Sequence, residues 1–596
     1  MSKDELSKAD PLEVEATREN EVEDVSDSVS TTEPKESAIK SSPSFWSKAM
    51  SFLEVQEKGD LSTVQLFLYN FDLRPVEEER RRWSWYNYVF YWISDSFNVN
   101  TWQIAATGVT AGLTWWQTWI AVWIGYALCG MFVSIGSRVG IMYHVSFPVA
   151  ARPAFGIFGS LWPIINRVVM ACVWYSVQGW IGGQCVQLML QAIFPHIRTT
   201  LGTQLKGTTS FEFLSFFLFW LFSLPAIWFP PHQIRHLFTV KAYVSPVAGV
   251  GLLVWTIVKA NGIGPVVHQS SSLHGSEWGW AFVTAIMTSL ANFATLIVNA
   301  PDFSRFADKP SFAMKYIVYT LSVPICFSLT SLIGILVSSA STSMYGETYW
   351  SPLDVLERFL DHNSSGSRAG VFFLGLSFAL AQMGTNISAN SLSFGTDVTA
   401  ILPRFINIRR GGFLCAMLAL CICPWNLLTS SNMFTTYLSA YAVFLSAIAG
   451  VVACDYYYVR RGYLKLTHLY SLQAPEDPNT PSYYRYGRFG INWRAYAAYI
   501  CGILPNIVGF VGATETHKVP IGATRVYDLN FPLGFIASFL TYAFFCYISP
   551  IDGCPTTLFE KGWHEEWAEV ENFAAELRGE KIVDVKVEKD IISDSE

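Results

Sequence analysis

Long apolar stretches separated by short polar loops run through most of the chain. A stretch of about 20 apolar residues is long enough to cross a bilayer as a helix. At that length the pattern predicts twelve membrane spans, near residues 86–106, 117–137, 157–193, 211–229, 236–258, 279–299, 317–339, 370–396, 411–430, 432–455, 494–512 and 529–548. We therefore expect an all-α polytopic membrane protein whose twelve-helix domain occupies residues 85–550.

The two ends of the chain are polar. Residues 1–84 are rich in Ser, Glu and Lys, a composition typical of a disordered tail, and residues 551–596 form a second polar tail. The loops on the side of both tails carry most of the Lys and Arg, including "RPVEEERRRW" before the first span, so the positive-inside rule places both tails in the cytoplasm. Asn363 then begins a glycosylation sequon in an outside loop.

Composition excludes several classes of protein. Of the 596 residues, 51% are hydrophobic and 15% charged, and no basic field suggests a nucleic-acid partner. The 11 cysteines are scattered and the 10 histidines lie singly or in loops, so we expect no metal site, no bound cofactor and no enzyme. A channel is disfavoured because the polar groups gather at one depth instead of lining a continuous path.

Polar side chains at mid-depth set four spans apart. In hydrocarbon such groups are costly without partners, so they should face the bundle interior or a cavity. The first span, "WISDSFNVNTWQIAATG", carries so many polar residues that a broken helix is expected. The eighth, "LAQMGTNISANSLSFGTD", places three amides, Gln382, Asn386 and Asn390, within ten residues, more than helix packing requires.

The third and sixth spans pair an amide with an aromatic ring. Trp174 and Gln178 lie one helical turn apart and so share a face. In the sixth span, "TSLANFATLIVNAPDFSRF", Asn292 precedes Phe293 and Pro301 ends the apolar run. Structural explanations remain open for these residues, because a glutamine often joins helices in membrane bundles and a tryptophan often belongs to the core.

Interruptions in spans one and six, five spans apart, indicate an inverted-repeat transporter with a site near the membrane midplane. The first ten spans would form two five-helix repeats and leave two further helices. Unwound backbone at the two breaks exposes carbonyl groups and helix ends that can bind an ion or a polar ligand.

Several long motifs, in order, give the chain a close resemblance to a known family. They are "DLRPVEEERRRWSWYNYVFYWISDSFNVNTWQIAATG", "SFPVAARPAFGIFGSLWPIINRVVMACVWY", "ANFATLIVNAPDFSRFA", "YWSPLDVL", "LAQMGTNISANSL", "INIRRGGFLCAMLALCICPWNLL" and "EKGWHEEWAEVENF". The sequence resembles the fungal Fur group of the nucleobase-cation-symport-1 family, within the purine-cytosine permease superfamily. The resemblance covers nearly everything outside the N-terminal tail and implies a LeuT-like five-plus-five fold with discontinuous helices 1 and 6.

The resemblance also implies a function. A secondary active transporter that imports uracil across the plasma membrane by proton symport is expected, with an allantoin or uridine permease as the alternative. A nutrient receptor that binds the same ligand without moving it is the alternative from another class. Family members keep their substrate site in spans 1, 3, 6 and 8. By that likeness Trp174 stacks on a planar ligand, Gln178 and Asn390 bond its edge, and Phe293 closes the other face, with Asn292 and Asn98 as further candidates.

The cation site of sodium-coupled relatives maps onto two of the same spans. The corresponding positions in this chain are Ser94, Phe97, Ala381, Gly384 and Thr385. A family hydroxyl position is glycine here, which weakens the case for sodium and favours a co-transported proton. Asp95 and Lys241 are the candidate charges for proton coupling, because burial shifts the protonation of such groups toward neutrality.

Four lysines near the start of the N-terminal tail lie among Ser and Glu: Lys3, Lys8, Lys35 and Lys40. The family resemblance suggests ubiquitin ligase machinery as a partner at these lysines. A tail that merely stays solvated fits the composition equally well.

Overall fold

The computed structural model describes residues 54–55, 62–70, 72–229, 231–263, 267–308, 317–361, 364–475, 477–514 and 518–554, with the backbone alone for 231–239 and 317. These residues belong to one structural unit, Glu54–Glu596. The predicted ubiquitin-site lysines, the sequon residue Asn363 and the tail beyond residue 554 lie outside the described residues.

Eight helical segments in the described residues are long and apolar enough to cross a membrane. They are α5 (Trp115–Tyr143), α10 (Ser210–Trp228), residues 240–259 of α11 (Pro231–Lys259), η3 and α17 (Ile317–Leu321, Ser322–Tyr345), α19, η4 and α20 (Ser365–Thr385, Asn386–Ser391, Leu392–Ile401), α22 and η6 (Ser431–Cys454, Asp455–Val459), α24 (Trp493–Thr514) and α26 (Asn530–Ile548). The protein is therefore a multi-pass membrane protein, and these segments coincide with eight of the predicted spans.

The other four predicted spans have a different form. The third is one long helix, α8 (Leu161–Ile193), whereas the first and sixth are divided and the ninth is short. The ninth, predicted at 411–430, contains the 12-residue helix α21 (Ile408–Ala419), followed by η5 (Pro424–Asn426). At 1.5 Å per residue α21 is about 18 Å long, well short of a hydrocarbon layer of about 30 Å, so this prediction was too long.

Both predicted helix breaks are present. The first span consists of α3 (Trp85–Ser96) and α4 (Val99–Thr110), and the extended residue Asn98 between them caps α4 by accepting a bond from Thr101 N at 2.9 Å. The sixth consists of α13 (Gly275–Asn292), α14 (Ala294–Val298) and α15 (Ala300–Ser304). At each break, near the centre of the bundle, some backbone N–H and C=O groups do not take part in continuous helical hydrogen bonding.

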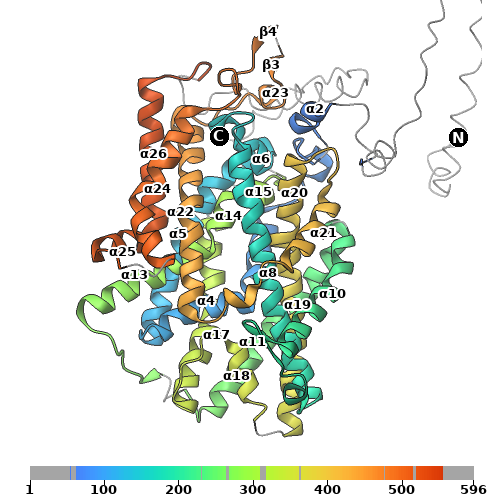
Figure 1. The fold of residues 1–596 in the computed structure, drawn as a ribbon, viewed down its shortest axis with the longest axis vertical. Helices are drawn as coiled ribbons and strands as arrows, with labels where there is room; N and C mark the ends of the chain where they lie inside the picture. Colours follow the sequence, from blue (N-terminus) through green and yellow to red (C-terminus); the bar gives the residue numbers. More distant parts are fainter. Residues whose placement is uncertain are drawn as a thin grey trace, which may run out of the picture. The chain divides into compact units, whose positions relative to one another are not determined.

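Long-range packing joins helices that are distant in sequence. α8 packs against α10 and α19, α5 against α13 and α17, and α22 against α24 and α26. In Figure 1, α24 and α26 stand beside α22 at one side of the bundle, and α8, α10, α19 and α21 stand at the other. The divided helices α4 and α14 lie between these groups.

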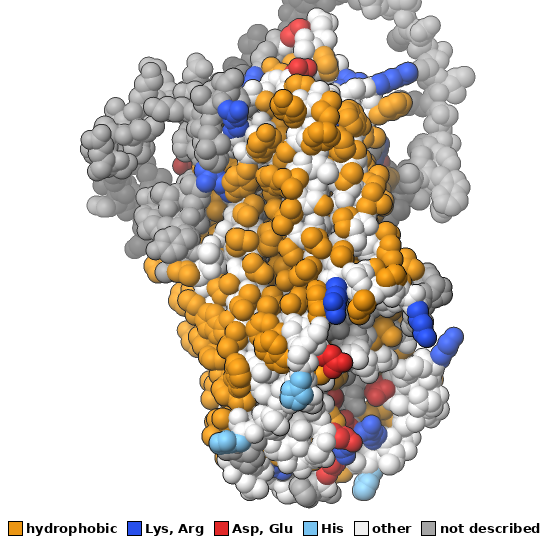
Figure 2. Space-filling model, turned by 90° about the vertical axis from the view of Figure 1, so that its left-hand side faces the viewer, with side chains coloured by type: hydrophobic (Ala, Val, Ile, Leu, Met, Phe, Trp, Pro, Cys, Tyr) orange, Lys and Arg blue, Asp and Glu red, His pale blue; other side chains and the backbone are white. Residues whose placement is uncertain are grey.

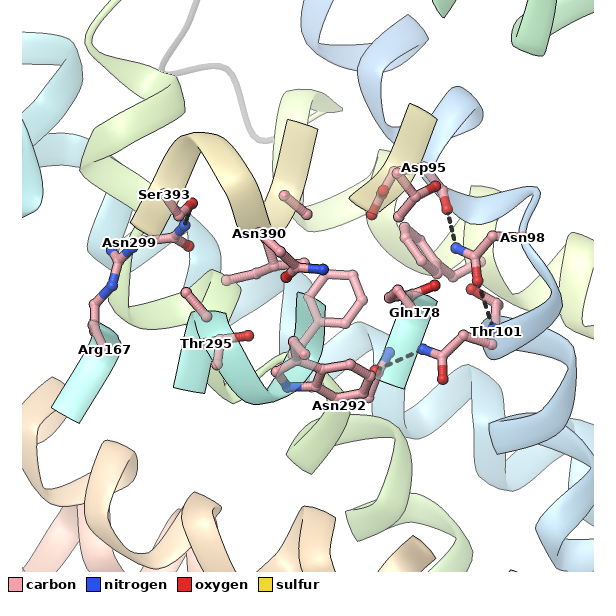
Figure 3. A pocket seen from close by; sticks show the side chains of 18 residues that line it. Asp95, Asn98, Thr101, Arg167, Gln178, Asn292, Thr295, Asn299, Asn390 and Ser393 are labelled. Carbon is pink, nitrogen blue, oxygen red and sulfur yellow. Dashed lines mark hydrogen bonds between the residues drawn. The ribbon is translucent and has the colours of Figure 1, made fainter. Parts of the chain in front are cut away.

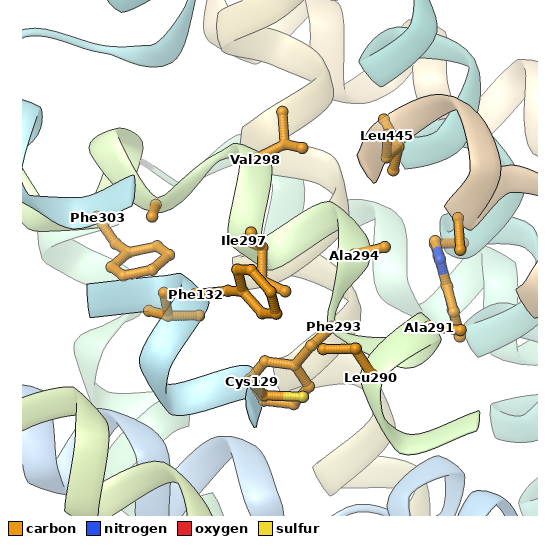
Figure 4. Close-up of a cluster of buried hydrophobic side chains, with 14 of the residues drawn as sticks. Cys129, Phe132, Leu290, Ala291, Phe293, Ala294, Ile297, Val298, Phe303 and Leu445 are labelled. Carbon is orange, nitrogen blue, oxygen red and sulfur yellow. The ribbon is translucent and has the colours of Figure 1, made fainter. Parts of the chain in front are cut away.

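Apolar side chains form both the core and the lateral surface. Figure 2 shows hydrophobic side chains covering the middle of one face, while charged side chains gather near its ends. Phe222, Val247 and Leu540 are exposed side chains of membrane-spanning helices, where they can contact lipid. Inside, α5 and α13–α14 meet in the cluster of Figure 4, where Phe293 and Leu290 are fully buried.

Short elements fill the loops. They are α2 (Thr63–Leu68), η2 (Glu78–Arg80), α6 (Phe147–Ala150), α7 (Arg152–Phe155), α9 (Ile197–Thr200), α18 (Pro352–Arg358), α23 (Leu466–Leu469), α25 (Ile521–Asp528) and two antiparallel pairs, β1–β2 (Gln204–Leu205, Thr208–Thr209) and β3–β4 (Gln473–Ala474, Asp477–Pro481).

The predicted N-terminal tail ends earlier than residue 84. The segment from residue 62 is folded: Ser62 and Gln65 form a capping box, and Leu66, Phe67 and Leu68 of α2 are buried. The guanidinium of Arg152 donates to the carbonyls of Phe67 and Leu68 at 2.7 and 2.9 Å. The apolar residues of α2 are buried in the folded protein. The average composition of residues 1–84 is polar and does not reveal this short apolar helix.

Candidate functional site

A cavity of about 60 Å³ lies where the two divided helices pass α8 and the eighth span. All six residues proposed for ligand binding line it: Asn98, Trp174, Gln178, Asn292, Phe293 and Asn390. In Figure 3, Asp95, Asn98 and Thr101 lie at one end, Gln178, Asn292 and Asn390 in the middle, and Arg167, Asn299 and Ser393 at the other end. Four helices far apart in sequence thus bring aromatic rings and amides to one place.

α8 contributes the ring and the amide predicted to share a face. Trp174 is 7% exposed, and its ring makes edge contacts with Phe434 and Tyr441 at 6.3 Å. The Oε1 atom of Gln178 accepts a bond from Gln382 Nε2 at 2.7 Å. Gln178 therefore does join two helices, as the structural explanation expected, and its amide nitrogen is the end that remains for a ligand.

Glycines beside Gln178 let a neighbouring helix come close. A Cβ at Gly183 would lie 2.6 Å from the Cα of Phe216 on α10, a distance that no side chain tolerates. The small residues that follow Gln178 in the sequence therefore serve close packing of α8 against α10.

The first and sixth spans supply amides at their breaks. Asn100 Nδ2 donates to Asn292 Oδ1 across the cavity at 3.4 Å, which links α4 to the end of α13. The side chain of Asn98 donates to the Asp95 carbonyl at 2.5 Å and accepts from Thr101 N. Both the nitrogen and the oxygen of the Asn98 amide are therefore bonded within the first span, where they stabilise the break between α3 and α4. Of the six residues proposed for ligand binding, Asn98 has the least support.

Phe293 is completely buried although it lines the cavity. Its ring packs edge-on against Phe327 at 4.8 Å and Tyr126 at 5.4 Å, and Trp92 lies 6.0 Å away. This aromatic cluster fixes the ring, so Phe293 forms a rigid apolar part of the cavity wall.

The dense polar run of the eighth span forms a π-helix, η4, between α19 and α20. Such wider turns occur frequently at functional sites. Within it Asn390 Nδ2 donates to Asn386 Oδ1 at 2.9 Å, and Asn386 Nδ2 donates to the Tyr175 carbonyl of α8 at 3.0 Å. The extra residue in this turn orients Asn390 toward the cavity and ties η4 to the helix that carries Trp174.

The residues proposed for cation or proton coupling divide into two sets. Asp95 and Thr385 line the cavity, whereas Ser94, Phe97, Ala381 and Gly384 do not. Lys241 of α11 is 2% exposed and donates from Nζ to Thr385 Oγ1 at 2.6 Å. A buried ammonium group therefore sits on the hydroxyl that the family resemblance assigns to a cation.

Sequence reasoning missed the end of the cavity formed by Arg167, Thr295, Asn299 and Ser393. Arg167 Nη1 lies 2.9 Å from Asp302 Oδ2, and its Nη2 lies 2.9 Å from Asp397 Oδ2. The available signal was an arginine and an aspartate inside apolar spans, since ionisable residues at membrane depth are rare and functional.

Comparison with known proteins gives consistent matches. A family model described as permease for cytosine/purines, uracil, thiamine, allantoin matches residues 75–534. The chain is 51% identical over 553 residues to the allantoin permease of Saccharomyces cerevisiae, covering 90% of this chain and 85% of the relative. It is 52% identical over 551 residues to the uracil permease of the same yeast, again covering 90% and 85%.

Two further proteins, a third yeast permease and a solved transporter structure, are also similar to this chain. The uridine permease of Saccharomyces cerevisiae is 50% identical over 539 residues, covering 88% of this chain and 82% of the relative. A solved nucleobase-cation-symport-1 family transporter, in a closed conformation with bromovinylhydantoin bound, is 22% identical with a TM-score of 0.64. It covers 84% of this chain and 99% of the other, a likeness that concerns the fold alone.

Proposed function

The chain belongs to the family of membrane permeases for cytosine/purines, uracil, thiamine and allantoin, and from this premise we propose that it imports uracil across the plasma membrane by proton symport. Relatives of nearly equal identity are named allantoin, uracil and uridine permeases, so allantoin or uridine is the alternative substrate. A receptor that binds the same ligand without moving it is the alternative class.

The composition of the cavity carries this proposal. Trp174 offers a flat ring, and Gln178 and Asn390 offer amides at the edge of the space beside it. Uracil is a planar ring whose N–H and C=O groups alternate, and the amide nitrogen of Gln178 and the amide oxygen of Asn390 would offer it a donor and an acceptor. Apolar faces with a few placed polar groups are the usual form of a small-molecule site.

Lys241 supports a proton rather than sodium as the coupled ion. Its ammonium group bonds Thr385 Oγ1, and Gly384 beside it provides no hydroxyl. A sodium ion beside Thr385 would be repelled by the positive charge of Lys241. It would also have one oxygen ligand fewer than in sodium-coupled relatives. In the proposed mechanism Asp95, on the broken first span, and Lys241 exchange the coupled proton.

The wider organisation follows the same proposal. The twelve spans would form two inverted five-helix repeats and two further helices, with both tails in the cytoplasm. The N-terminal lysines would then be within reach of cytoplasmic ubiquitin ligase machinery. In this arrangement the Arg167 end of the cavity faces the cytoplasm, because α8 enters the membrane from that side.

The test is uptake of radiolabelled uracil in cells that lack their own pyrimidine transporters, with unlabelled uracil, allantoin or uridine as competitors. We expect faster uptake at acid external pH, blocked by unlabelled uracil. Gln178→Ala should abolish uptake at normal surface abundance. Gln187→Ala is the matched control, because Gln187 is buried on the same helix but does not line the cavity.

Each alternative has its own outcome. Saturable uptake of radiolabelled allantoin or uridine, with no uracil uptake, would reassign the substrate. Binding without flux would identify a receptor. Asp95→Asn and Lys241→Met should both lose the acid stimulation of uptake, and the proton-coupling assignment fails if both retain it.

A further inference from the structure

Three charged side chains meet at the end of the cavity opposite the broken first span. Arg167 comes from α8, Asp302 from α15 and Asp397 from α20, and Arg167 holds both carboxylates at 2.9 Å. Their side chains are 3%, 14% and 0% exposed, respectively. Of the three residues only Arg167 lines the cavity, and the cluster connects α8 and α20, which both supply lining residues, to α15, which begins directly after the lining residue Asn299 (Figure 3).

The two carboxylates differ in how well they are satisfied. Asp302 Oδ1 accepts the Phe147 backbone N–H at 2.8 Å, and its Oδ2 accepts from Arg167. Asp397 Oδ2 lies near Arg167 Nη2, but among the described residues neither oxygen of Asp397 receives a well-aligned hydrogen bond. A fully buried carboxylate in this state is costly if it is charged.

The charges also do not balance. One guanidinium faces two carboxylates, so the cluster carries one excess negative charge when all three groups are ionised. The remaining ionisable groups on α8 and α21, the helices packed against α20, do not correct this. Cys172, Tyr175 and Cys415 lie in one apolar cluster and Cys185 in another. Arg409 and Arg410 are exposed at the start of α21. A single proton on Asp397 removes the excess.

We propose that Arg167, Asp302 and Asp397 form the inner gate of the transporter and that the gate closes with one proton bound to Asp397. The proposal rests on the proposed proton symport and deepens it by naming a second proton site, beyond Asp95 and Lys241. When α15 and α20 move apart, water reaches the cluster and solvates the charged carboxylate. The O–H bond of Asp397 then breaks, a cytoplasmic water takes the proton, and Asp397 remains as a carboxylate.

Arg167 acts as the latch between the helices. Its guanidinium also lies 5.0 Å from the centre of the Phe147 ring, which leaves little freedom to turn away while the gate is closed. A ligand that leaves toward the cytoplasm has to pass this side chain, so ligand exit and proton release occur at one place.

The test separates proton coupling from gate movement. Net accumulation of uracil is measured at two external pH values beside exchange of uracil in preloaded cells, because exchange needs gate movement but no net proton transfer. With one coupled proton, each pH unit of gradient adds about tenfold to the attainable accumulation. Asp397→Asn keeps the size of the side chain and imitates its protonated form.

We expect Asp397→Asn to retain exchange within about twofold and to lose accumulation by at least about tenfold, with no remaining acid stimulation. Asp354→Asn, a carboxylate on α18 away from the cavity, should leave both measurements unchanged. If Asp397→Asn accumulates uracil with the wild-type pH dependence, the proton site is rejected.

Asp302→Asn provides a second, independent variant if Asp397→Asn fails to reach the surface. It leaves Arg167 balanced by Asp397 alone, so Asp397 stays charged and the same loss of accumulation is expected, whereas unchanged accumulation rejects the proposal. If uptake by the wild-type protein did not depend on external pH, the proposed proton symport itself would be rejected. The two failures are thereby distinguished by the wild-type measurement.

Discussion

Arg460 and Arg167 are both buried beside carboxylates, yet their surroundings are opposite. Arg460 Nε pairs with Asp455 Oδ2 at 2.9 Å, and Tyr542 donates to Asp455 Oδ1 at 2.8 Å. Arg167 faces two carboxylates, one of them poorly bonded. The first cluster is neutral and satisfied, whereas the second, at one end of the cavity, carries one excess negative charge when all three of its groups are ionised.

The difference indicates that the contacts of the Arg460 cluster are permanent, whereas those of the Arg167 cluster can be broken. Arg460 also donates to the Pro153 carbonyl at 3.2 Å, so its cluster ties η6 and α26 to the loop that contains α7. A buried ion pair of this kind is strongly destabilised when one partner is removed, because the other charge is left alone. The Arg167 cluster is held less completely, as suits contacts that are broken and remade during transport.

The largest expected effect is that of Asp455→Ala. Removal of this carboxylate leaves the Arg460 charge buried without a partner and should lower the free energy of unfolding by about 3–5 kcal/mol. Asp302→Asn should change it by less than about 1 kcal/mol, because Arg167 keeps Asp397. Thermal unfolding of the purified proteins in one detergent measures both changes. Equal losses in the two variants would remove the distinction between the clusters.

A second experiment separates the cavity from the scaffold on a single helix. Trp174 lines the cavity, whereas Trp180 packs against Phe216 and Trp425 at 5.7 and 5.6 Å. Trp174→Ala should weaken uracil binding by about 1–3 kcal/mol, roughly 5- to 150-fold in Kd, through loss of stacking, and Trp174→Phe should restore most of it.

Trp180→Ala is the matched control and should lower Tm while leaving Kd unchanged. Equilibrium binding and thermal unfolding of the same three preparations decide the matter. A loss of affinity in Trp180→Ala equal to that in Trp174→Ala would mean that packing of α8, not stacking, controls binding.

Apolar length and composition predicted most of the fold. They located the eight segments that remain continuous or nearly so, and the polar runs located the breaks in spans one and six. They failed at α21, where an apolar run continues past the end of the helix at Ala419, and at α2, where a short apolar helix is hidden in a polar tail. Both errors arise because burial against distant segments is not visible in a local window.

The candidate site was predictable only in part for a related reason. Trp174 and Gln178 share a helical face, so their proximity follows from spacing alone. The contact of Lys241 with Thr385, 144 residues away, depends on how α11 lies beside α19. The same holds for Arg167, Asp302 and Asp397: each is visible as a charge within or beside a span, but their meeting is a product of helix packing.

The smallest expected effect concerns another carboxylate, Asp354 on α18, outside the membrane-spanning segments. Burial, and next the charge of Glu357, raise the pKa of Asp354 to about 7, while Arg358 acts in the opposite direction. The folded protein therefore holds a proton that the unfolded chain, with a pKa near 3.8, has already released. Stability should fall as the pH rises from about 4 to about 7, by an amount on the order of 1 kcal/mol given partial solvent exposure.

Asp354→Asn should flatten this dependence, measured as Tm across the same pH range, without changing the acid stimulation of uptake. The reason is position: Asp354 lies away from the cavity, so its proton does not travel with the ligand. If Asp354→Asn abolished acid stimulation while Asp397→Asn retained it, proton coupling would belong to the loop that contains α18. The contrast between a satisfied scaffold and an unsatisfied gate would then have no bearing on transport.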